Sequence, residues 1–222
     1  MAGAGKDGRM TCRCASLKFD FAPHRERAAD SVIVTQYRAT AGETDHEKAA
    51  SIHTRLSKHE SGHAITAIAF NKTIHHLTIG AGQPHLCFDL LSGEATVDAL
   101  ALINVAGYVA EGSPAPSWGD MRAALHRARE KNKGICDLCK LFDLVVSACP
   151  DRDGREIINT VYDTFDAAAA LFQSPEWSGA LDALSAELEA KTLLRGVDIA
   201  AIVSVFNLAA PLATIKPIWT SK

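Results

Sequence analysis

The sequence predicts a mainly helical protein with a small two- or three-stranded sheet beside one long helix. Apolar residues recur at helical spacing over most of the chain, and only two short segments alternate as strands do. Gly and Pro lie at most of the boundaries between these segments. The 222 residues are 47% hydrophobic and 22% charged, so the chain has the composition of a globular protein that buries a core.

The first 44 residues lack a sustained hydrophobic period, so we expect residues 1–44 to form a partly ordered arm ahead of one domain at 45–222. This arm carries scattered charges where an export signal needs an unbroken apolar stretch. The six cysteines therefore do not indicate a disulfide framework, and we expect a cytoplasmic or similarly reducing, soluble compartment. No segment has the length and apolar composition of a membrane span.

The overall charge argues against a polyanionic partner. The chain has 23 Lys and Arg against 26 Asp and Glu, which gives a net charge of −3. Proteins that bind nucleic acid or anionic lipid usually present an excess of positive charge. We therefore expect no nucleic-acid partner.

The domain is expected to begin with one long helix at about 45–70, because apolar residues keep helical spacing after the start signal Thr44-Asp-His-Glu47. A strand at 74–79 and a second short strand at about 86–90 follow, and we expect them to pair. Six further helices are predicted from spacing and from Gly or Pro breaks. They lie at about 94–111, 120–132, 135–148, 155–172, 177–191 and 197–208.

The stretch His59-Glu-Ser-Gly-His63, inside the long predicted helix, carries the most informative chemistry. Residues four apart differ by about 40° around a helix, so both imidazoles point from one face and can hold one zinc ion. Glu60 projects beside them, and a glutamate so placed accepts a proton from the zinc-bound water and passes it to the leaving amine. The following apolar residues indicate burial, where two histidines and a glutamate need a partner. We interpret the motif as a zinc site rather than as an exposed helix with solvated histidines.

A catalytic zinc needs a third protein ligand as well as an open position. Spacing alone leaves this ligand open among several downstream side chains. They are His75, His76, His85, Cys87, Asp89, Glu94, Glu111 and Asp120.

Four segments, in order, resemble motifs of the FtsH-type zinc metallopeptidases. His59-Glu-Ser-Gly-His-Ala64 is similar to H-E-[AS]-G-H-A, and Val105-Ala-Gly-Tyr-Val-Ala-Glu111 to L-A-G-R-x-A-E. Gly119-Asp-Met-Arg-Ala-Ala124 resembles N-D-[LI]-x-x-A, whose Asp is the family's third zinc ligand. Glu189-Ala-Lys-Thr-Leu-Leu-Arg-Gly196 resembles E-K-E-T-L-x-G near the carboxy terminus. The resemblance covers about 44–206.

This resemblance implies an FtsH-like helical fold and a zinc metalloendopeptidase. Because 222 residues are too few for an attached ATPase module as well, we expect this activity to work without an ATPase of its own. The resemblance implies that His59, His63 and Asp120 bind Zn²⁺ and that Glu60 is the catalytic base. Glu111 is the rival third ligand, or it orients a zinc-bound imidazole. Asp120 could instead only stabilise a helix start. The expected substrate is a peptide or flexible protein, with a homo-oligomer or a separate ATPase as further partner.

Two other functions stay open. One is a catalytically weak or inactive zinc-fold protein that serves as a binding or regulatory module, because Tyr108 stands where the family has arginine. The other is a zinc hydrolase that acts on a non-peptide amide. Cys136-Asp-Leu-Cys139 could form a structural zinc site or a redox pair, but no convincing second cysteine pair accompanies it. We interpret both thiols as small core residues of a helix.

Overall fold

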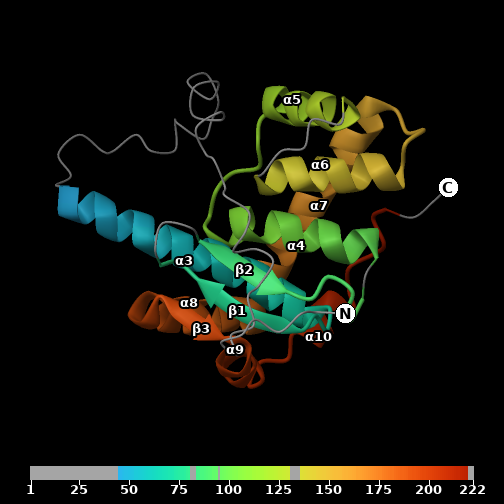
Figure 1. Cartoon of the computed structure of the whole chain (residues 1–222). Helices are drawn as coiled ribbons and strands as arrows, with labels where there is room; N and C mark the ends of the chain where they lie inside the picture. Colours follow the sequence, from blue (N-terminus) through green and yellow to red (C-terminus); the bar gives the residue numbers. More distant parts are fainter. Residues whose placement is uncertain (1–44, 81–83, 95, 131–135, 220–222) are drawn as a thin grey trace, which may run out of the picture.

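Eight helices and one three-stranded sheet make up the residues that the computed structural model describes, which are 45–80, 84–94, 96–130 and 136–219 (Figure 1). The predicted mainly helical fold with a small sheet is confirmed. The arm expected at 1–44 lies outside the described residues. The elements are α3 (Asp45–Ala69), β1 (Ile74–Thr78), β2 (His85–Phe88), α4 (Val97–Ala110), α5 (Trp118–Arg129), α6 (Asp137–Ala148), α7 (Gly154–Phe172), α8 (Pro175–Lys191), β3 (Leu193–Arg195), α9 (Gly196–Val203) and α10 (Ala209–Leu212).

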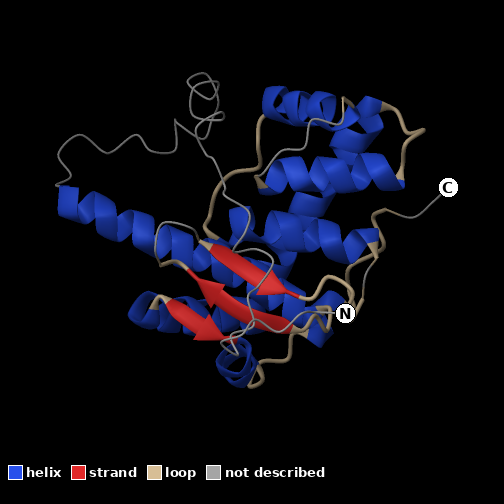
Figure 2. Ribbon diagram, in the orientation of Figure 1, coloured by secondary structure: helices blue, strands red, loops and turns tan. Residues whose placement is uncertain are grey.

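The sheet is antiparallel, with the strand order β2-β1-β3, and it lies across α3 (Figure 2). Leu77, the fourth residue of β1, pairs with Leu86 of β2 and with Leu194 of β3. Leu77 and Leu194 are fully buried, so this side of the sheet packs into the core. The third strand was not expected as a separate element, because its three residues are too few to show an alternating pattern.

The helices form a stack in which α5 packs on α6, α6 on α4, α4 on α3, and α3 on α8 (Figure 1). The contact between α3 and α4 is close because Gly62 lies against the backbone of Ala106 and the side chain of Ala110. A Cβ atom at Gly62 would lie 2.5 Å from the Cβ of Ala110. This close packing brings the histidine-bearing turns of α3 against α4.

Two hydrophobic clusters fill the molecule. The first gathers side chains of α4, α5, α6 and α7 with Trp219, and the second those of α3, the sheet, α8 and α9 around Trp177. Both tryptophans are anchored, since Trp219 donates to Thr164 Oγ1 and Trp177 to the carbonyl of Leu208. Across the described residues, no helix combines the length and the apolar character that crossing a membrane requires.

Candidate metal centre

Three side chains from two helices meet at one point. His59 and His63 lie on consecutive turns of α3, and their Nε2 atoms are 3.1 Å apart. Asp137 is the first residue of α6, and its Oδ2 lies 3.1 Å from Nε2 of His59 and 3.3 Å from Nε2 of His63. Among the residues that the structure describes, this is the one group of three or more whose ligand atoms could hold a metal ion.

The contacts of the Nδ1 atoms of His59 and His63 explain why a cation is favoured between their Nε2 atoms and Asp137. Nδ1 of His63 lies 2.6 Å from the carbonyl oxygen of Ile103, which can only accept, so this nitrogen donates. Nδ1 of His59 lies 3.4 Å from Oε2 of Glu111, which is also an acceptor. In neutral rings held in this way, both Nε2 atoms carry lone pairs. Two nitrogen lone pairs and a carboxylate oxygen then face one another, and a shared positive charge stabilises them.

The distances between these atoms fit zinc. Ligand atoms at the usual bond lengths of a tetrahedral zinc site lie about 3.3 Å from one another. The three observed separations, between 3.1 and 3.3 Å, are close to this value. Two imidazole nitrogens and one carboxylate oxygen are also a donor set that zinc accepts in hydrolytic sites. The residues present therefore fit a zinc ion.

Without a metal ion, a proton on His59 supplies the positive charge between the imidazoles and Asp137. Burial lowers the pKa of His59, but hydrogen bonds with the carboxylates of Asp137 and Glu111 outweigh burial and raise this pKa to about 10. Burial raises the pKa of Asp137, but His63 and His59 hold it well below its ordinary value. A metal that binds here must therefore displace a proton from the imidazole pair.

Glu60 lies one residue after His59 on α3 and is only 7% exposed. Burial raises the pKa of its carboxyl group, and the nearby His63 and His59 oppose this rise. Within the described residues its carboxylate makes no hydrogen bond, so its oxygens are not committed to another group. A buried carboxylate with a raised pKa has the property that a general base needs near neutral pH.

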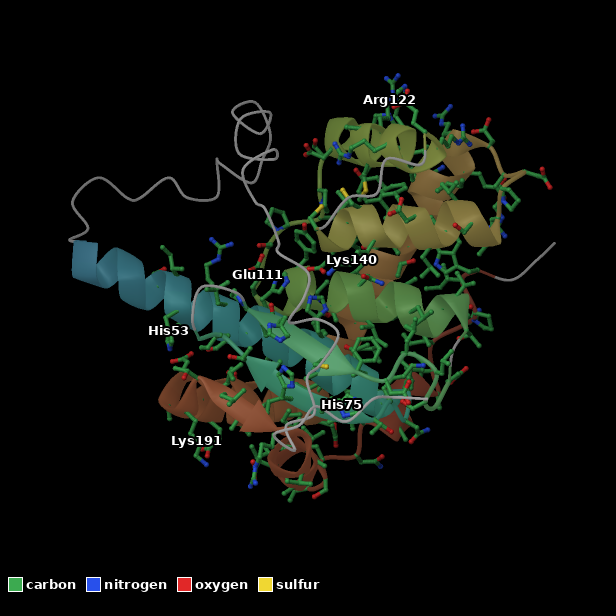
Figure 3. The ribbon with its side chains drawn as sticks, in the orientation of Figure 1. His53, His75, Glu111, Arg122, Lys140 and Lys191 are labelled. Atoms are coloured by element: carbon green, nitrogen blue, oxygen red, sulfur yellow. The ribbon has the colours of Figure 1, made fainter. Side chains whose placement is uncertain are left out.

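Two further side chains contact two of the three candidate ligands, His59 and Asp137. Glu111 follows α4 and places Oε2 against Nδ1 of His59, while its Oε1 accepts from the hydroxyl of Ser113. Lys140 lies one turn after Asp137 and places Nζ 2.9 Å from Oδ1, which leaves Oδ2 to the histidines. Figure 3 shows Glu111 and Lys140 near the place where α3, α4 and α6 meet. Glu111 thus contacts His59, the imidazole that it would orient if zinc were bound, and it does not belong to the group of candidate ligand atoms.

No family model and no curated protein matches the chain. The resemblance to FtsH-type metallopeptidases therefore rests on the quoted motifs.

Asp120, expected as the third zinc ligand, is not brought to the histidines. It lies in the first turn of α5, where its carboxylate accepts from the hydroxyl and the backbone N–H of Ser117 in a capping box. Asp137 takes the position beside the histidines instead. A sequence signal for this existed, because Asp137 is followed by Leu138, as in N-D-[LI], whereas Asp120 is followed by Met121.

The remaining candidates for the third ligand lie on the sheet or in the segment that follows it. None of them belongs to the group of ligand atoms found among the described residues. They are His75, His76, His85, Cys87, Asp89 and Glu94.

Gly107 of α4 has no side chain, and this leaves space for the imidazoles of His59 and His63. A Cβ atom on this residue would lie 2.5 Å from Nε2 of His63 and 2.6 Å from Nε2 of His59. Tyr108, the next residue, packs its ring edge-on against His59, with 5.8 Å between the ring centroids. Gly107 is therefore part of the architecture of the site although it supplies no ligand.

Proposed function

We propose that this protein is a zinc-dependent metallopeptidase that hydrolyses peptide bonds in peptides or flexible protein segments. The observation that carries the proposal is the convergence of His59, His63 and Asp137 beside the buried Glu60. The segment His59-Glu-Ser-Gly-His-Ala64, which resembles the H-E-[AS]-G-H-A motif of FtsH-type metallopeptidases, supports the same chemistry and the same roles for His59, Glu60 and His63.

His59, His63 and Asp137 would hold the zinc ion, while Lys140 and Glu111 keep the ligands in place. A bound zinc ion lowers the pKa of water and polarises the scissile carbonyl group. Glu60 accepts a proton from the attacking water and delivers it to the nitrogen of the leaving amine. Its raised pKa suits both transfers, because the carboxyl group can hold the proton between them.

The test is the substitution Glu60→Gln, which keeps the shape of the side chain and removes its basicity. We expect cleavage of casein or of an unfolded peptide to fall by about 10²–10⁴-fold, because a general base contributes about that much to the rate. Zinc content, measured on the purified protein, should stay at about one ion per chain. Glu156→Gln, on the exposed surface of α7, is the matched control and should cleave as the wild type does.

The two measurements separate the alternatives. Unchanged cleavage by Glu60→Gln would overturn the assigned mechanism. A normal zinc content without cleavage of any unfolded substrate by the wild type would instead favour a zinc-binding regulatory module. A wild-type protein that binds no zinc would contradict the metal centre itself.

A further inference from the structure

Two cysteines flank the candidate ligand Asp137 at the start of α6. Cys136 is the N-cap of this helix, and its Sγ accepts from the backbone N–H of Cys139. The two Sγ atoms lie 3.1 Å apart, and both residues are thiols. Asp137 therefore belongs to the short stretch of chain that a bond between these sulfurs would close into a ring.

We propose that Cys136 and Cys139 form a reversible disulfide whose formation weakens metal binding by Asp137. This inference rests on the proposed metal centre and adds a modification site that regulates it. The Cα atoms of residues three apart in a helical turn lie about 5 Å from each other, which is within the Cα separation of roughly 4.4–6.8 Å that a disulfide spans. The sulfurs need to approach by only about 1 Å to reach bonding distance.

Closing this bond changes the turn that positions the ligand. The side chain of Cys136 now caps α6, and this cap sets the path of the chain through Asp137. A functional ligand must stay within about 0.5 Å of its productive position. Drawing the two sulfurs together pulls on the backbone at both sides of Asp137, so its Oδ2 leaves the point that it shares with the histidines.

The difference in exposure between Cys136 and Cys139 indicates which sulfur reacts first with an external disulfide. Cys136 is partly exposed, whereas Cys139 is 2% exposed, so a small disulfide such as oxidised glutathione meets Cys136 first. Cys136 exchanges with that disulfide: its sulfur loses its proton and bonds to one glutathione, and the other glutathione leaves as a thiol. Cys139 then attacks the Cys136 sulfur of the mixed disulfide and releases the second glutathione. Two protein thiols thereby lose two protons and two electrons, and one glutathione disulfide becomes two thiols.

Disulfide formation and zinc binding are thermodynamically linked, so each must weaken the other by the same factor. If the disulfide weakens zinc binding by some factor, zinc shifts the thiol-disulfide equilibrium toward the thiols by the same factor. A tenfold effect corresponds to about 30 mV for a two-electron couple. This reciprocity supplies a measurement that does not depend on peptidase activity.

The experiment equilibrates the full-length protein in glutathione buffers, with and without zinc, and then blocks the free thiols by alkylation. Trypsin cleaves after Lys133 and Lys140, so one peptide carries both cysteines and no other. We expect this peptide to lose two hydrogens and to escape alkylation in oxidising buffer. We expect zinc affinity of the oxidised protein, measured by competition with a chelating dye, to fall at least tenfold and to recover on reduction.

Two variants serve as controls. Cys136→Ser keeps an N-cap oxygen, so the helix should form while zinc affinity no longer responds to glutathione disulfide. Cys149→Ser, at the other end of α6, should respond as the wild type does.

The outcomes distinguish this proposal from the proposed function. Absence of the disulfide in peptide 134–140 would overturn it, as would a disulfide that leaves zinc affinity unchanged. A wild-type protein that binds zinc only when reduced but cleaves nothing would support the disulfide site and contradict the peptidase. A reduced protein that binds no zinc would contradict both.

Discussion

Asp137 uses its two carboxylate oxygens for different contacts. Oδ2 faces both imidazoles, and Oδ1 accepts from Lys140 within the same helix. Because Lys140 holds the carboxylate at one oxygen, the other oxygen is oriented before any metal arrives. Because the two oxygens have different partners, a substitution can remove the charge of the Asp137 carboxylate without removing the contact that orients it.

The substitution Asp137→Asn tests its assignment as the third ligand. We expect zinc affinity to fall by more than the 10–100-fold that loss of an orienting partner usually costs, because a neutral amide replaces a charged ligand. The measurement is competition with a chelating dye of known affinity.

Asp120→Asn is the matched control for Asp137→Asn. Asp120 lies in the capping box of α5, so its substitution should lower the free energy of unfolding by about 0.3–1 kcal/mol without changing zinc affinity. If Asp120→Asn lost zinc and Asp137→Asn retained it, the ligand assignment from the structure would be wrong.

The sequence predicts the contribution of α3 to the site but not that of α6. His59, Glu60 and His63 lie within five residues of one helix, so helical spacing alone places the two imidazoles on one face. Asp137 comes from a position 74 residues after His63, and only the packing of α6 on α4 brings it there. Asp120 and Asp137 both begin helices, so local pattern alone favours neither.

At the scale of elements, the crossing of α3 and α4 provides a second test of the site. Gly107→Ala places a methyl group 2.5 Å from Nε2 of His63 and 2.6 Å from Nε2 of His59. These atoms belong to side chains and not to the backbone, so the imidazoles can turn away from Asp137 while the helices stay packed. We expect a folded protein, by circular dichroism and thermal unfolding, with zinc affinity at least tenfold lower.

Gly62→Ala is the comparison for Gly107→Ala. The added methyl group at Gly62 would meet the backbone of Ala106 and the side chain of Ala110, which cannot turn away. Overpacking of this kind costs about 1–3 kcal/mol of the free energy of unfolding. A Gly107→Ala variant that bound zinc normally would show that α4 does not confine the imidazoles.

The hairpin of β1 and β2 provides a pH-dependent contact. Nε2 of His76 lies 2.9 Å from Nε2 of His85, and burial, His85 and His75 lower the pKa of His76. Arg195 of β3 pairs with His76 in the sheet, and its exposed guanidinium binds Asp198. Since the folded state disfavours the protonated form of His76, its contribution to stability is complete above the unfolded pKa and decreases as pH falls below it.

We therefore expect the wild type to lose more stability than His85→Gln between about pH 7.5 and about pH 5.5. Glutamine can still donate to His76 and stays neutral over this range. Urea unfolding of the metal-free proteins at both pH values measures the difference. Equal losses in the two proteins would show that the histidine pair does not contribute to the pH dependence.

Most elements follow from local sequence pattern, and the exceptions have physical reasons. Helices α3, α7 and α8 lie within a few residues of their predicted bounds because long apolar periods and start signals define them. β3 has only three residues, so it exists through its pairing with β1. The segment predicted as one helix at 197–208 contains α9 and then a turn, and after this turn the carbonyl of Leu208 accepts from the indole N–H of Trp177.

In the whole molecule, the candidate metal centre lies between the two hydrophobic clusters. Asp137 comes from α6, whose buried residues other than Cys139 belong to the cluster shared with α4, α5 and α7. His59 and His63 come from α3, which packs on the sheet and on α8. A metal bound by all three residues would join α3 directly to α6, which otherwise contacts it mainly through α4.

This position predicts that zinc stabilises the entire fold rather than one loop. At a free zinc concentration about 100 times the dissociation constant, binding to the native state adds about 2.7 kcal/mol to the free energy of unfolding. For a chain of this length that corresponds to a rise in Tm of about 5–10 °C. We expect this rise in the wild type, its reversal by a chelator, and its loss in Asp137→Asn. An equal rise in Asp137→Asn would mean that zinc stabilises the protein from another site, and His76 with His85 would then be the first pair to substitute.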